Sequence, residues 1–176
     1  MILGLLVTSQ RFFEVISMAH SIGLGMIGMN EKSDRILKGV LHDQVIPANN
    51  IHVVESDASK RAAYLDMGVH CEPDVSTSTL RSEIMILSVD RKELSTTLSS
   101  ICGVTRGKIL VSMVENRNCE YIQSRVAKAT NVVCVEQKEE AGKLVSRLTY
   151  SERFPNHMKS AVNDIFKSIG SIETAE

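Results

Sequence analysis

The stretch Glu83-Ile-Met-Ile-Leu-Ser-Val89 decides the fold class, because it is apolar at nearly every position. A strand that is apolar on both faces is typical of a parallel sheet covered by helices on its two sides. The spacing of Leu94, Leu98 and Ile101 places three apolar side chains on one face of a following helix. This region therefore predicts one strand–helix unit of an α/β fold.

The same alternation of strand and helix continues outward from this unit in both directions. Further strands are expected near residues 24–29, 51–55, 108–114 and 131–135, and a last edge strand is compatible with 147–150. Short connections between alternating units imply a mostly parallel, doubly wound sheet with helices on both faces. The sequence thus predicts a single α/β domain over residues 21–172.

The helices of this domain are expected over 32–41 and 59–67, after Asn118, and over the last apolar stripe of the chain. Asn118 and Asn156 are expected to cap their helices. Ile165 and Phe166 lie on the apolar stripe of the last helix, so both are expected to be buried against the sheet. The polar segment 138–143 is expected to be a solvated, mobile loop.

The bulk composition fits one globular domain without a nucleic-acid or membrane partner. The chain has 176 residues, is 43% hydrophobic, carries a net charge of −1, and has 4% aromatic residues with no Trp. A basic footprint for nucleic acid, a polybasic membrane patch and a base-stacking surface are therefore not expected. No run reaches the roughly 18 apolar residues of a membrane span.

The start of the chain and its metal-binding residue types point to a cytoplasmic protein without a metal site. Residues 1–20 precede the first unit, either as an extra strand and helix or as a poorly ordered arm, and no signal peptide is expected. The cysteines are widely spaced and the histidines show no ligand spacing, so we expect free thiols in a reducing compartment. The four cysteines are Cys71, Cys102, Cys119 and Cys134.

A glycine-rich segment precedes the expected first helix. Gly23, Gly25 and Gly28 satisfy the spacing G-x-G-x-x-G, which serves for a tight turn, close backbone approach to a diphosphate and close helix packing. In one register these three glycines form the turn. In the other, 25–29 is the strand, Gly28 is the first loop glycine, and Met29 and Asn30 complete the turn. The spacing to the next strand favours the second register.

An acidic residue ends the next expected strand, where such a residue holds a ribose hydroxyl in dinucleotide sites. This residue is Glu55. Ser56, Lys60 and Arg61 follow it and could instead meet the 2′-phosphate of NADP. A solvated loop without a ligand is the third interpretation, so the sequence leaves NADP, NAD and no cofactor open here.

Several segments, in order, match one known family. They are 28–41 (Gly-x-Gly-Asn-Met and a helix), 45–47 and 51–56 (Val-x-Pro turn and second strand), 67–69 (Met-Gly-Val), 83–89, 110–113 (Val-Val-Ser-Ile) and 162–170 (Leu-Phe-x-x-Ile-Gly). From about Ser21 to Glu176 the chain resembles pyrroline-5-carboxylate reductases. The resemblance implies a Rossmann-like NAD(P)-binding domain of an oxidoreductase of the proline biosynthesis type.

The departures from this family gather in the loops at the carboxyl ends of the strands, where ligands bind in such sheets. Asn30 replaces the second turn glycine, Val89-Asp90-Arg91 replaces Val-Lys-Pro, Val114-Glu-Asn116 replaces Ala-Ala-Gly, and 136–140 replaces Met-Pro-Asn-Thr-Pro. The resemblance places cofactor contacts near Val89 and Asp90. We therefore expect binding of NADP or NAD to be weak or lost.

The resemblance also implies a carboxy-terminal helical domain that builds a dimer and supplies the substrate pocket. The chain stops near residue 176, about where that domain should begin, so the domain is expected to be absent and this chain alone inactive. No catalytic residue is assigned. The alternative is a non-catalytic interaction domain with a protein partner or a second copy of itself, which keeps the fold and has lost the cofactor.

Overall fold

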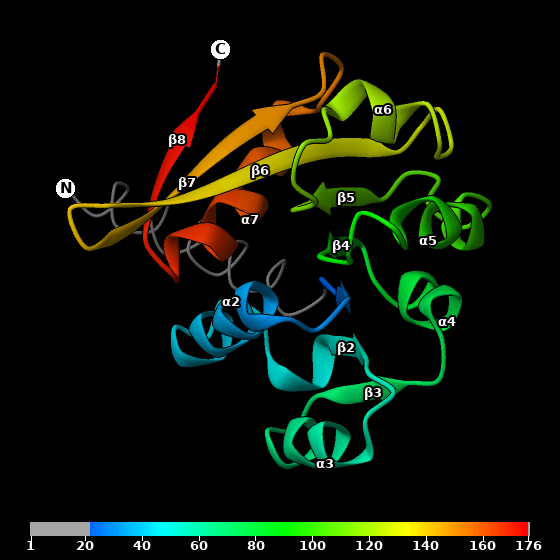
Figure 1. Ribbon diagram of the computed structural model, residues 1–176, viewed down its shortest axis with the longest axis vertical. Coiled ribbons are helices and arrows are strands. Elements are labelled where there is room, and N and C mark those ends of the chain that lie inside the picture. The colour runs from blue at the N-terminus through cyan, green and yellow to red at the C-terminus, as the bar shows by residue number, and fades with distance from the viewer. Residues whose placement is uncertain (1–21, 176) are drawn as a thin grey trace, which may run out of the picture.

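A computed structural model describes residues 22–175, and the extension expected over 1–20 lies outside the described residues. Within these residues, eight strands form one sheet in the order β3-β2-β1-β4-β5-β6-β7-β8 (Figure 1). The strands are β1 (Leu24–Ile27), β2 (Ile51–Val54), β3 (His70–Glu72), β4 (Ile84–Leu87), β5 (Ile109–Ser112), β6 (Asn131–Glu140), β7 (Lys143–Tyr150) and β8 (Ser171–Thr174). Only β6 and β7 pair in antiparallel fashion, which confirms the mostly parallel Rossmann-like α/β fold.

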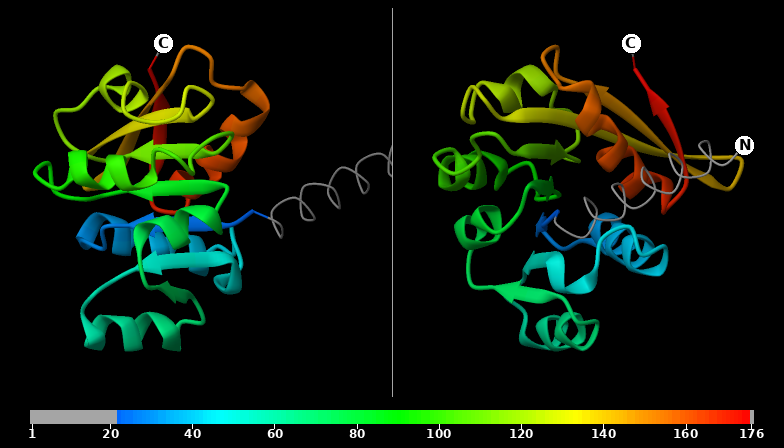
Figure 2. Two further views of the ribbon diagram at one scale, coloured as in Figure 1. Left: turned by 90° about the vertical axis from the view of Figure 1, so that its right-hand side faces the viewer. Right: turned by 180° about the vertical axis from the view of Figure 1, so that it is seen from behind.

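Helices cover both faces of this sheet (Figure 2). They are α2 (Glu31–His42), α3 (Ala58–Asp66), α4 (Val75–Leu80), α5 (Leu94–Ile101), α6 (Cys119–Gln123) and α7 (Asn156–Lys167), with a short 3₁₀ turn at Ala48–Asn50. The apolar strand β4 shows why two faces are needed. Ile84 and Ile86 join the core on one side, while Met85 and Leu87 join the core on the other.

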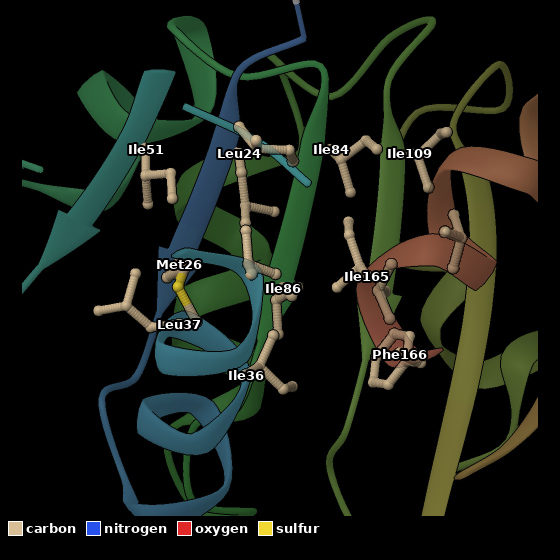
Figure 3. Close-up of a cluster of buried hydrophobic side chains, with 14 of the residues drawn as sticks. Leu24, Met26, Ile36, Leu37, Ile51, Ile84, Ile86, Ile109, Ile165 and Phe166 are labelled. Carbon is tan, nitrogen blue, oxygen red and sulfur yellow. The ribbon is translucent and has the colours of Figure 1, made fainter. Parts of the chain in front are cut away.

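The larger core lies between the sheet and the helices α2 and α7 (Figure 3). Ile36 and Leu37 of α2 are fully buried, as are Ile165 and Phe166 of α7. The expectation that the last helix docks on the sheet is therefore confirmed. The second core contains Leu94, Leu98 and Ile101 of α5, whose i, i+4, i+7 spacing indicated this face.

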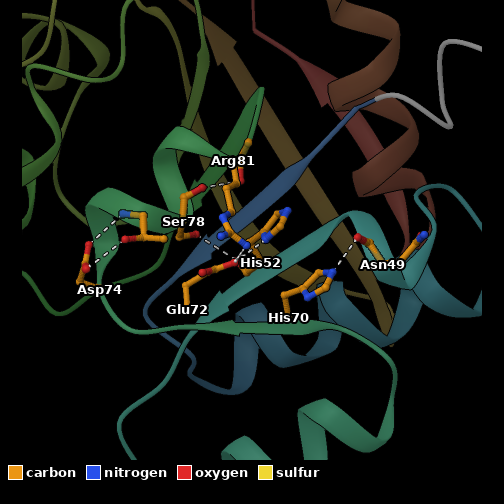
Figure 4. A network of polar contacts seen from close by, with 9 residues as sticks. Asn49, His52, His70, Glu72, Asp74, Ser78 and Arg81 are labelled. Carbon is orange, nitrogen blue, oxygen red and sulfur yellow. Dashed lines mark hydrogen bonds and ion pairs between the residues drawn. The ribbon is translucent and has the colours of Figure 1, made fainter.

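Edge strand β3 was not expected from the sequence, and polar contacts tie it to β2 and α4 (Figure 4). His52 Nδ1 lies 2.8 Å from Glu72 Oε1, and Arg81 Nη1 lies 3.3 Å from the same carboxylate oxygen. The ring of His70 stacks on that of His52 with centroids 5.1 Å apart. These side chains share the burial of one carboxylate among several partners, as buried charges require.

The expectation of a mobile loop over 138–143 is wrong. Strands β6 and β7 run through this segment and form a hairpin that projects beyond the rest of the sheet (Figures 1 and 2). Ala141 and Gly142 make the connection with φ of 49° and 75°. Two positive φ values match the twist of a two-residue hairpin turn, and glycine adopts the second one without strain.

Two further expectations about helix ends and strands are corrected. Asn156 is the first residue of α7 rather than its cap, since the cap position is Pro155 and no side chain caps this end. Proline is favoured around the first turn because it has no N–H to satisfy. By contrast, Asn118 caps α6 as expected and accepts a hydrogen bond from the N–H of Tyr121. Strand β8, which pairs with β7, was not expected.

Candidate functional site

The turn after β1 begins at Gly28, which gives the second of the two registers. Gly28 has a φ of 86°, and a Cβ at this position would lie 2.6 Å from the carbonyl oxygen of Ser88. A side chain is therefore excluded both by the backbone conformation and by the neighbouring strand end. This turn lies at the carboxyl end of β1, where ligands bind in open α/β sheets.

The other two glycines of the motif are needed for packing. A Cβ on Gly25 would lie 2.8 Å from Ser82 Oγ, and a Cβ on Gly23 would meet the carbonyl oxygen of Arg81. Gly23 precedes β1 and Gly25 lies inside it, so both face the end of α4 rather than the turn. The G-x-G-x-x-G match thus combines two packing positions with one turn position.

Asn30 closes the turn with its own side chain. Its Oδ1 accepts hydrogen bonds from the N–H groups of Lys32 (3.0 Å) and Ser33 (3.2 Å), and its Nδ2 donates to the carbonyl oxygen of Ser88 (2.7 Å). With φ of −112° Asn30 is extended, so it does not adopt the left-handed backbone of a turn glycine. The first N–H groups of α2, which bind phosphate in dinucleotide sites, are therefore engaged by protein.

Two serines that the sequence reasoning missed complete this arrangement. Ser33 is buried, donates to the carbonyl oxygen of Gly28 (2.8 Å) and accepts from the N–H of Asn30 (2.9 Å). Ser88 Oγ donates to Asn30 Oδ1 at 3.1 Å. The Asn-x-x-Ser spacing of a capping box could have indicated Ser33, whereas nothing local in the sequence indicated Ser88.

A groove of about 490 Å³ lies next to this turn, at the carboxyl ends of β1, β4 and β5. Strand order reverses between β1 and β4, and the crevice at such a point is the usual ligand site of this fold. The groove brings together Asn30, Val89 and Asp90 from the positions expected in the sequence. Its other lining residues are Glu31, Lys32, Ser88, Arg91, Met113, Val114, Glu115 and Asn116.

The charges around the groove do not favour an anion. Lys32 Nζ lies 2.6 Å from Glu115 Oε1, and this hydrogen bond holds the pKa of the Glu115 carboxyl below its usual value. Glu31, Asp90 and Arg91 supply the other lining charges, so acidic groups outnumber basic ones. A diphosphate would have to compete with Glu115 for Lys32.

The expected ribose-binding residues lie after β2, outside the lining of this groove. Glu55 Oε1 accepts a hydrogen bond from the N–H of Asp57 at 2.9 Å, and its other oxygen lies 3.9 Å from Lys60 Nζ. Ser56 lies between them and is exposed. Burial, Asp34 and Glu55, in that order, raise the pKa of the nearby Tyr64 to about 12.

A second cavity, of about 330 Å³, adjoins the groove at the ends of β5 and β6. It shares Lys32 and residues 113–116 with the groove and is also lined by Arg117, Cys119 and Cys134. The segment 136–140, expected as a loop of this rim, belongs to strand β6 instead. Sequence reasoning assigned no role to this cavity.

The strand order and the groove at its reversal define a Rossmann-like domain of the dinucleotide-binding type. No family model matches the chain. Among curated proteins, a pyrroline-5-carboxylate reductase from Glycine max is 24% identical over 161 residues, covering 90% of this chain and 59% of the relative. The chain thus spans about 59% of the length of this curated relative.

Solved structures give the same family. A pyrroline-5-carboxylate reductase from Coxiella burnetii has a TM-score of 0.82 at 15% identity, covering 89% of this chain and 60% of that one. A Plasmodium falciparum pyrroline carboxylate reductase with NADP bound has a TM-score of 0.78 at 18% identity, covering 89% and 58%. The resemblance to the amino-terminal portion of pyrroline-5-carboxylate reductases is therefore confirmed in sequence and in fold.

Two findings bear on other classes of function. Every helix within residues 22–175 is too short or too polar to cross a membrane. In the same part of the chain, no group of three or more His, Cys, Asp or Glu side chains is placed to hold a metal ion.

Proposed function

We propose that this chain is the nicotinamide-dinucleotide-binding domain of a pyrroline-5-carboxylate-reductase-like oxidoreductase, and that it binds its cofactor weakly. The observation that carries the proposal is the groove of about 490 Å³ at the point where strand order reverses. It lies in a fold shared with a reductase solved with NADP bound. The volume is in the usual range of cofactor sites, about 300–1,000 Å³.

In this proposal the diphosphate lies over the turn formed by Gly28, Met29 and Asn30, and the nicotinamide end lies along Val89 and Asp90. The adenosine ribose lies towards the end of β2, where Glu55 suits a free ribose hydroxyl, whereas Ser56 and Lys60 suit the 2′-phosphate of NADP. Gly23 and Gly25 contribute indirectly, because they allow β1 to pack against α4. The bound cofactor would supply the hydride, and the protein would position it.

Weak binding follows from the turn itself. In a typical site of this fold, free N–H groups at the start of the helix hydrogen bond to the diphosphate. Here the N–H groups of Lys32 and Ser33 already donate to Asn30 Oδ1, and the Lys32 ammonium is paired with Glu115. The ligand must displace these partners, and the free energy needed for this reduces the affinity.

Calorimetric titration of the 176-residue chain with NADPH and with NADH tests the proposal. We expect a dissociation constant on the order of 0.1 mM for at least one of them, equivalent to about −5.5 kcal/mol. A folded chain that gives no heat of binding with either nucleotide at millimolar concentrations contradicts cofactor binding.

A second candidate function is a non-catalytic interaction domain that has lost the cofactor. One observation favours it, namely that the side chain of Asn30 and the carbonyl of Ser88 close the phosphate turn. The same titration separates the two candidates. Absence of binding in the folded chain, together with no gain when Asn30 is replaced by glycine, supports the interaction domain with a protein partner or a second copy.

A further inference from the structure

Two cysteines that are distant in sequence lie side by side at the second cavity. Cys119 is the first residue of α6, and Cys134 lies in the middle of β6. Thr149 of β7 is the register partner of Cys134, and Cys119 Sγ donates a hydrogen bond to the carbonyl oxygen of Thr149 at 3.2 Å. The Cys134 thiol in turn hydrogen bonds to Cys119. Both thiols line the cavity of about 330 Å³.

The two thiols differ in exposure and in acidity. Cys119 is partly exposed, and the hydrogen bond from Cys134 lowers the pKa of its thiol although burial acts in the opposite direction. Cys134 is buried, and the hydrogen bond with Cys119, followed by burial, raises the pKa of its thiol. The thiolate is the reactive form of cysteine, so the first reaction with an oxidant falls on Cys119.

We propose that Cys119 and Cys134 form a reversible, peroxide-driven disulfide, with Cys119 as the attacked thiol and Cys134 as the resolving thiol. The Cys119 sulfur attacks one oxygen of a hydroperoxide, the O–O bond breaks, and the leaving oxygen takes up a proton. Cys119 becomes a sulfenic acid. The Cys134 sulfur then attacks the Cys119 sulfur, the S–O bond breaks, and water leaves. The two sulfurs lose two electrons, and hydrogen peroxide is reduced to two molecules of water.

This disulfide would act on the neighbouring groove. It joins the start of α6 to β6 and so fixes the segment that leads into α6. Glu115 and Asn116 of this segment line both the groove and the second cavity. Asn116 has a φ of 58°, a strained conformation for a residue with a side chain, so this segment has a conformational preference that a crosslink can hold or release.

The remaining cysteines provide internal controls. Cys102 is exposed and its thiol donates to the carbonyl oxygen of Ser99, while the thiol of Cys71 donates to the carbonyl oxygen of Arg61. Neither has a thiol as its hydrogen-bond partner in these contacts. Exposure alone therefore predicts oxidation of Cys102, whereas the proposal predicts a crosslink between the other two.

The test is mass spectrometry of the reduced 176-residue chain after brief treatment with hydrogen peroxide and quenching with N-ethylmaleimide. We expect a monomer that has lost two hydrogen atoms and carries two fewer maleimides than the reduced chain. Digestion should give a peptide linking Cys119 to Cys134, and dithiothreitol should reverse the change. Cys119→Ser and Cys134→Ser should each abolish the crosslink, whereas Cys102→Ser and Cys71→Ser should retain it.

A second measurement keeps the order of reaction testable. In Cys134→Ser, dimedone should trap a sulfenic acid on Cys119, and circular dichroism should show that the variant is folded. Treated wild-type chain in which Cys119 and Cys134 both stay reduced, or in which Cys119 proceeds to sulfinic acid without a crosslink, overturns the proposal. Because the readout is a covalent bond, it does not depend on whether a dinucleotide binds.

Discussion

At the scale of single residues, Asn30 determines what the turn after β1 can bind. Replacing Asn30 with glycine should strengthen NADPH binding several-fold, because it frees two N–H donors at the start of α2. Glycine is itself an acceptable cap and costs only a few tenths of a kcal/mol relative to asparagine. Calorimetric titration of wild type and Asn30→Gly with NADPH measures the change directly.

The matched control for this variant is Asn118→Gly. It removes the same type of cap from α6, but Asn118 does not line the groove beside the turn. Its NADPH affinity should equal that of wild type. Equal affinity of Asn30→Gly and wild type would show that the diphosphate does not bind over this turn.

The residues of the site were only partly predictable. Gly28 and Asn30 could be placed by motif and spacing, because turn chemistry is local in sequence. The closure of the turn could not, since Asn30 Nδ2 bonds to Ser88, which belongs to a strand 58 residues away. The contact between Cys119 and Cys134 was missed for the same reason, because it depends on how α6 packs against β6.

At the scale of elements, α7 is held by one large side chain. Phe166 is fully buried between α7 and the sheet, so Phe166→Ala should lower the free energy of unfolding by about 3–5 kcal/mol. Urea denaturation measures this loss. Lys167→Ala on the same helix is the control and should change stability by less than about 0.5 kcal/mol, because its pairing with Asp164 is exposed. A loss of under about 1 kcal/mol for Phe166→Ala would mean that α7 is not docked.

The β6–β7 hairpin depends on a turn with an unfavourable residue. Ala141 has a φ of 49°, a conformation that asparagine tolerates better than alanine. Ala141→Asn should therefore raise the free energy of unfolding by roughly 0.5–1 kcal/mol. Thermal or urea melts are the measurement.

A variant of the neighbouring residue should have the opposite effect. Gly142 has a φ of 75° and no atom within 4 Å of an added Cβ, so Gly142→Ala changes only the backbone preference. It should lower stability by about 1 kcal/mol. The turn assignment would be refuted by two variants that change stability in the same direction.

The parallel core was predictable because strands buried on both faces form continuous apolar runs, as in β4. The additional edge strands were harder. His70–Glu72 and Ser171–Thr174 are short and polar, and they become strands because β2 and β7 offer a free edge. The segment 138–143 failed in the same way, since its charged residues resemble a loop and its pairing is visible only in the fold.

At the scale of the whole molecule, we predict that the 176-residue chain does not by itself convert pyrroline-5-carboxylate to proline. The matched region is only 59% of the soybean relative, and holding a substrate in position can supply about 7–11 kcal/mol of barrier lowering. NADPH absorbance with substrate present is the assay. Measurable proline formation by the purified chain, above a no-protein control, would contradict the prediction.

The strand order has a consequence for how this molecule folds. Glu140 pairs with Lys143 across a two-residue turn, whereas Leu24 pairs with Ile84. Local pairing of a hairpin takes about 1–10 μs, while pairing between distant segments must first close a long chain. Ribosomes synthesise β1 first, yet β1 has to wait for both β2 and β4 before it is flanked on both sides. The last-made hairpin therefore has the shorter search, and the inner strands determine the overall rate.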